Sequence, residues 1–131
     1  MVILGTTEFG HMEAGGLNRH LVSGQPGEKD SVAVMLNFKN DSCKTIETIA
    51  FFFLPYNAVN RVASSGQRKP EEAQLRFIGA IQPNEVKRQV YWENVWYSQE
   101  IVQVKLVHID ITYSDGSIES LNNHQIQFEC A

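Results

Sequence analysis

Residues 101–120 have the sequence IVQVKLVHIDITYSDGSIES, in which apolar and polar side chains alternate before a polar turn. Successive side chains of a β-strand point to opposite faces of the sheet, so this spacing predicts a strand with one apolar face. That face is expected to comprise Val107, Ile109, Ile111 and Tyr113, with His108, Asp110 and Thr112 on the opposite face. The pair Asp115 and Gly116 then predicts a tight hairpin, because both central residues of a type I′ turn need positive φ.

The same period of two recurs through the rest of the chain, and no helical period extends beyond a single turn. The further predicted strands are Ser31–Lys39, Lys44–Tyr56, Leu75–Ile81, Val86–Tyr97, Ile118–Leu121 and Gln125–Glu129, with a short edge strand at Asn60–Ala63. Seven or eight short, mostly antiparallel strands separated by turn residues are typical of an all-β sandwich. We therefore predict an immunoglobulin-like β-sandwich.

The chain has 131 residues, which fits one domain. We expect residues 1–25 to form an N-terminal strand or arm packed on the sandwich, and residues 26–131 to form the immunoglobulin-like domain. The formal net charge of −4 argues against a nucleic-acid partner, which would require many phosphate contacts from basic side chains. No stretch approaches the roughly 20 apolar residues of a membrane span, and the N-terminal residues do not have the pattern of an export signal.

Catalytic and cofactor motifs are not found in the sequence, so we expect a non-enzymatic protein that binds no metal or cofactor. His108 and Asp110 share one strand face and offer two ligands to a metal, but solvated polar residues account for the same pair. Glu71 and Glu72 are neighbours in a polar loop, where no apolar surroundings would raise a pKa for general-acid catalysis. The spacing leaves open whether Cys43 and Cys130 are two free thiols or a disulfide, and free thiols are favoured.

The segment Val86–Tyr97 holds the candidate binding residues, which are Tyr91, Trp92, Trp96 and Tyr97. Alternation places Val90, Trp92 and Trp96 on one face of the strand and Tyr91, Val95 and Tyr97 on the other. Exposed aromatic rings on a sheet stack on sugars or anchor a partner protein. Large rings also fill the space between two sheets, and the sequence leaves both interpretations open.

Five segments, taken together and in order, resemble an uncharacterised family of small bacterial immunoglobulin-like domains. They are Asn37–Ile46, Pro55–Val59, Gly79–Ile81 with Pro83, Trp92–Tyr97 and Ile109–Ser117. Domains of this family often follow zinc-ribbon or membrane-anchored segments in Gram-positive bacteria. The resemblance covers about Ala14 to Leu121, and it implies a β-sandwich without known catalytic residues, at the extracytoplasmic surface of a bacterium. The chain departs from the family at Asn60 and Arg61, where a Gly-Asp pair is usual, and at Ala80, where proline is expected.

These observations lead to two expected functions. The first is a structural or protein-interaction module that binds a protein partner or associates with itself, with edge strands at Asn60–Ala63 or Leu75–Ile81 as joining surfaces. The second is a carbohydrate-binding module that uses the exposed Trp and Tyr rings. Neither expectation includes nucleic-acid binding or direct membrane insertion.

Overall fold

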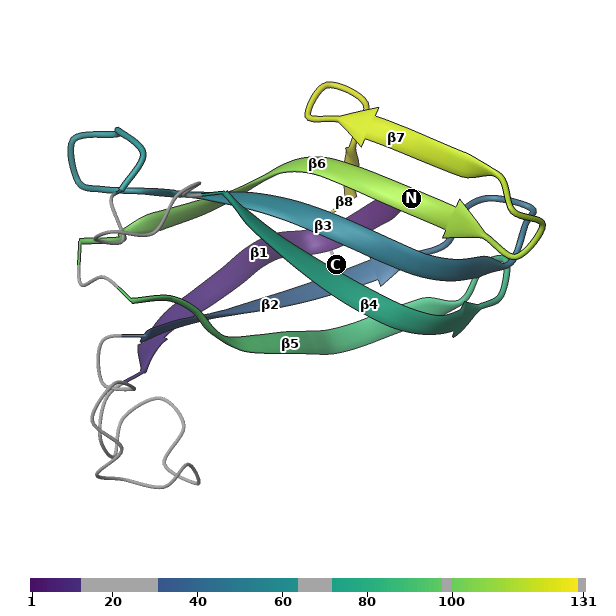
Figure 1. Ribbon diagram of the computed structural model, residues 1–131, viewed down its shortest axis with the longest axis horizontal. Helices are drawn as coiled ribbons and strands as arrows, with labels where there is room; N and C mark the ends of the chain where they lie inside the picture. Colours follow the sequence, from purple (N-terminus) through teal and green to yellow (C-terminus); the bar gives the residue numbers. More distant parts are fainter. Residues whose placement is uncertain (13–30, 64–71, 98–99, 130–131) are drawn as a thin grey trace.

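The computed structural model describes residues 1–12, 31–63, 72–97 and 100–129, which form two layers of β-sheet (Figure 1). The strands are β1 (Val2–Met12), β2 (Ser31–Lys39), β3 (Ile46–Tyr56), β4 (Ala73–Ile81), β5 (Val86–Tyr97), β6 (Gln103–Tyr113), β7 (Ile118–Asn122) and β8 (Gln127–Glu129). One sheet has the order β5-β2-β1-β8 and the other β4-β3-β6-β7. All pairs are antiparallel except β1 with β8, which is parallel.

The predicted all-β class is confirmed, and the described residues contain no helix, so none that could cross a membrane. Of the predicted N-terminal arm, Val2–Met12 forms strand β1, whereas residues 13–25 lie outside the described part of the chain. The predicted strand at Asn60–Ala63 is wrong. That segment is a turn joined to β3 by one bridge, because the Asn57 side chain accepts hydrogen bonds from the backbone N–H groups of Val59 and Arg61.

Aromatic rings from four strands meet between the two sheets and form the centre of the core. Phe38 of β2 lies 5.0 Å from Phe51 of β3, measured between ring centroids, and Phe77 of β4 meets Phe38 edge-on at 5.6 Å. Trp92 of β5 contacts Phe51 edge-on at 5.7 Å. Offset and edge-to-face pairs of this kind stabilise a core beyond the burial of their area. These contacts join the β5-β2 side of one sheet to the β3-β4 side of the other.

A β-bulge changes the phase of β6 in its middle. On β3, Phe52 pairs with His108 and Phe53 pairs with Leu106, so Val107 is an extra residue on β6. Leu106 is buried, Val107 is only half-buried, and alternation restarts with Ile109. The prediction that Val107 shares the core face with Ile109, Ile111 and Tyr113 is therefore wrong for Val107 alone.

Strand β5 contains two further irregularities, at Gln89 and Asn94, which both have positive φ, 58° and 57°. Trp92 pairs with Val34 of β2, and Trp96 pairs with Val32. Between these two pairs, β5 therefore contains more residues than β2 does. Val95 is consequently buried beside Trp96, and its predicted place on the face of Tyr91 is wrong. The irregularity at Asn94 interrupts strict alternation, so the neighbouring side chains of Val95 and Trp96 both reach the core.

Asn40 is fully buried and connects the β2–β3 loop with the turn between β4 and β5. Its side-chain amide donates to the carbonyl oxygens of Lys44 (2.8 Å) and Ile81 (3.0 Å), and its Oδ1 accepts from the Ser42 N–H and hydroxyl. Its backbone bonds to Glu85 and Asn84. Every polar group of this buried residue is thus satisfied, as burial requires.

We expect Asn40→Asp to lower the free energy of unfolding by about 3 kcal/mol, because the variant replaces two donors with an oxygen that faces two carbonyl groups. Urea unfolding at neutral pH measures the change. Asn123→Asp, in the exposed turn after β7, is the matched control and should change stability little. Equal effects of the two substitutions would contradict the role given to Asn40.

Candidate binding face

The outer face of the β4-β3-β6-β7 sheet carries a row of side chains that crosses all four strands. Ala50 of β3 pairs with Arg76 of β4 on one side and with Asp110 of β6 on the other, and Asp110 pairs with Ser120 of β7. Because Phe51 points into the core, its neighbour Ala50 faces outward. Because the Ala50 side chain is small, the surface is hollowed between the Arg76 guanidinium and the Asp110 carboxylate.

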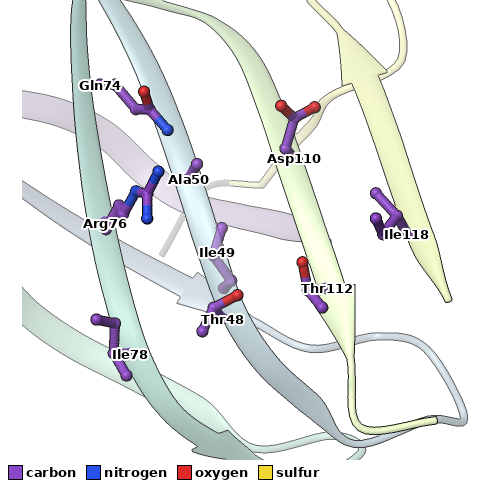
Figure 2. A pocket seen from close by; sticks show the side chains of 9 residues that line it. All are labelled: Thr48, Ile49, Ala50, Gln74, Arg76, Ile78, Asp110, Thr112 and Ile118. Atoms are coloured by element: carbon purple, nitrogen blue, oxygen red, sulfur yellow. The ribbon is translucent and has the colours of Figure 1, made fainter. Parts of the chain in front are cut away.

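The adjoining row is apolar at both ends. It runs from Ile78 through Thr48 and Thr112 to Ile118. Ile78 is 76% exposed and Ile118 is 70% exposed. Together with Gln74, Arg76, Ala50 and Asp110, these residues line a shallow depression of about 280 Å³. Figure 2 shows Arg76 and Asp110 on either side of Ala50, with the two isoleucines at the outer strands.

Asp110 is held in position by two neighbours. Ser120 Oγ donates a hydrogen bond of 2.7 Å to Asp110 Oδ1, and His108 Nε2 lies 2.7 Å from the same oxygen. Partial burial opposes ionisation, but the hydrogen bonds from Ser120 and His108 and the charge of His108 hold the pKa of Asp110 below its ordinary value. The His108 ring itself rests edge-on against Phe52, at 5.2 Å between centroids. A carboxylate thus fixed presents a steady negative charge to the depression.

Among the described residues, the Arg76 side chain has no ion-pair partner. In the same part of the chain, no donor forms a hydrogen bond to Asp110 Oδ2, since Ser120 and His108 both contact Oδ1. The Arg76 backbone, in contrast, is engaged, since Trp92 Nε1 donates to its carbonyl oxygen at 3.1 Å. This contact anchors the exposed edge of β4, which contains the predicted edge segment Leu75–Ile81. The side chains of Arg76 and Asp110 therefore offer opposite charges to a ligand or partner.

The four aromatic residues predicted to bind do not form one platform. Trp96 is 1% exposed in the core, and Trp92 is half-buried against Phe51. Tyr91 is 39% exposed, and the side chain of Tyr97 lies outside the described part of the chain. Carbohydrate binding by these residues stays a prediction, for which Tyr91 is the one open ring among the described side chains of the cluster.

The other chemical candidates are scattered. Within the described residues no three His, Cys, Asp or Glu side chains gather as a metal site, and His108 with Asp110 is a pair. Cys43 is an exposed free thiol, Glu72 is exposed, and Glu71 and Cys130 lie outside the described residues. A second depression, of about 310 Å³, adjoins Tyr113, whose pKa is raised to about 12 by burial and by its hydrogen bond to Glu119.

The fold is similar to that of a solved structure, whereas the sequence has no match among protein families. The chain matches no protein-family model and no curated protein. A solved structure of IrmA from Escherichia coli is similar, with a TM-score of 0.57 over 98% of this chain and 89% of the IrmA chain. The two sequences are 9% identical, so the similarity concerns the all-β fold and carries no functional residue. The family resemblance noted from the sequence stays a prediction.

We expect Ser120→Ala to raise the pKa of Asp110 toward the ordinary value of a carboxyl group, because the ionised form loses a hydrogen-bond donor. A carboxylate with a depressed folded-state pKa stabilises the fold above its unfolded pKa, and the effect is lost as pH falls through the folded value. In the variant, the ionised Asp110 carboxylate stabilises the fold less than in the unaltered chain. As the pH falls, this stabilisation is also lost completely at a higher pH.

NMR titration of the Asp110 carboxyl carbon measures the pKa directly. Ser114→Ala, at an exposed turn position, is the control and should leave the Asp110 titration unchanged. A titration curve of Ser120→Ala that coincides with that of the unaltered chain would show that the Ser120 hydrogen bond has no such effect.

Proposed function

We propose that the chain is an immunoglobulin-like, non-enzymatic module that binds another protein through the outer face of its β4-β3-β6-β7 sheet. The observation that carries the proposal is the combination of two exposed isoleucines, Ile78 and Ile118, with the Arg76 guanidinium and the anchored Asp110 carboxylate around one depression. Protein interfaces combine apolar contacts with arginine and with complementary charge in this way.

The order of the strands supports the immunoglobulin-like part of the proposal. Immunoglobulin domains have strands A, B and E in one sheet and strands C, F and G in the other. Here β1, β2 and β5 take the places of A, B and E, and β3, β6 and β7 those of C, F and G. β4 lies beside β3, as the added strand C′ lies in variable domains, and β8 adds an edge beside β1.

The electrostatics of the face support binding rather than catalysis. A general acid that works near neutral pH needs a raised pKa, whereas the pKa of Asp110 is lowered. The depression is shallow, and the side chains of Gln74, Arg76 and Ile78 in its lining are exposed. Such a surface suits contact with a second macromolecule, because it is accessible over several strands at once.

Site-specific photo-crosslinking tests the proposal. The photoreactive residue p-benzoylphenylalanine replaces Ile78, and the chain is irradiated both alone and in an extract of the cells that naturally produce it. We expect a discrete protein adduct, because Ile78 would lie in the interface. The adduct should be lost when Arg76→Glu is added, and retained with Arg88→Glu, a matched charge reversal on β5 in the other sheet.

The same photoreactive residue in place of Glu93, an exposed position on β5, is the positional control. An identical set of adducts from positions 78 and 93, or no discrete adduct from position 78, would count against binding through this face.

A further inference from the structure

We infer that the partner that binds this face is a second copy of the chain. The two copies pack face to face about a two-fold axis that lies between the two sheets, parallel to β3 and over Ala50. The inference rests on the proposed function and names its partner. Two-fold interfaces require a self-complementary surface, in which residue i contacts j and residue j contacts i. The rows on the outer face meet that requirement.

The charges are arranged for such a pairing. β4 and β6 flank β3, so a half-turn about an axis along β3 places β4 of one copy over β6 of the other. Arg76 and Asp110 pair with the same residue, Ala50, and so lie in one row on the two sides of the axis. The half-turn therefore sets each Arg76 against the Asp110 of the other copy, and two opposite-charge contacts form at once.

The same half-turn also brings side chains of the neighbouring rows of the two copies together. Ile78 of one copy comes to lie beside Ile118 of the other, because β7 continues the sheet one strand beyond β6. In the row on the other side of Ala50, Gln74 of one copy faces His108 of the other. Ile78 then lies over Thr112 of the other copy and next to its Ile118, so part of the exposed apolar area of both isoleucines is removed from water.

On β3, Ala50 meets its own counterpart at the axis, where its small side chain lets the two sheets approach, and the half-buried Phe52 ring of the next row meets its own counterpart as well. Aligned sheets pack about 10 Å apart with strand directions within about 30°, and a half-turn about β3 keeps the strands aligned. Three strands of each copy, β4, β3 and β6, overlap in this arrangement, and at about 4.8 Å apart and about 25 Å long they give an area of roughly 350 Å² per copy. Stable dimers commonly bury about 800 Å² per partner, so we expect a weak, concentration-dependent dimer.

Sedimentation velocity of the full chain over a range of concentrations tests the inference with two charge reversals. Arg76→Glu places a carboxylate against Asp110, and Asp110→Arg places a guanidinium against Arg76. Each variant alone should raise the dissociation constant of the dimer at least about tenfold, because like charges then meet twice. An equimolar mixture of the two variants should regain association, since both contacts between unlike copies then join a carboxylate to a guanidinium.

Controls separate this interface from other effects. Arg88→Glu and Glu93→Arg change the net charge equally but lie on β5 in the opposite sheet, and each should associate as the unaltered chain does. Far-UV circular dichroism and thermal unfolding establish that each variant is folded. Pairing through the β4 edge would not be regained in the mixture, because Asp110 of β6 lies on a strand away from that edge.

A chain that is monomeric at all concentrations, single reversals that associate normally, or a mixture that stays monomeric would each overturn the inference. The proposed function is judged separately. If the chain is monomeric but position 78 still crosslinks to a different protein, the face binds another partner and only the second copy is excluded. If position 78 gives no adduct of either kind, both proposals fail.

Discussion

The contact between Phe51 and Trp92, with Phe38 beside it, is the constraint on which the rest of the structure depends. It joins β3 of one sheet to β5 of the other, and it requires Phe51 to point inward. Since successive strand residues face opposite ways, Ala50 must then point outward. The packing of the core therefore determines which side chains form the outer face, even though none of those side chains takes part in the core.

Strand pairing then converts distant sequence positions into one surface. Arg76 and Asp110 are far apart along the chain, but both pair with Ala50 because β3 lies between β4 and β6. The Trp92 indole, which donates to the Arg76 carbonyl oxygen, also connects the core to the edge of this face. The similarity to IrmA, at 9% identity, concerns the fold alone.

The alternation of apolar residues was sufficient to predict the all-β class and most strands, because a half-buried strand imposes a period of two. It was not sufficient at Val107, Val95 and Asn60, where bulges or a side-chain-capped turn shift the phase without a glycine or proline to signal them. His108 and Asp110 were recognised as a pair on one face, since they lie two residues apart. Arg76, Ile78 and Ile118 were not, because their proximity depends on the order of strands in the sheet.

The most direct test of the account is the concentration dependence of backbone amide chemical shifts in ¹⁵N-labelled protein. If the outer face of the β4-β3-β6-β7 sheet is self-complementary, dilution should shift the amides around Ala50, Arg76 and Asp110 and leave those of β1, β2 and β5 unchanged. Shifts confined to β5 or to the β8 edge, or spectra identical at every concentration, would contradict the claim that this face joins two copies of the chain.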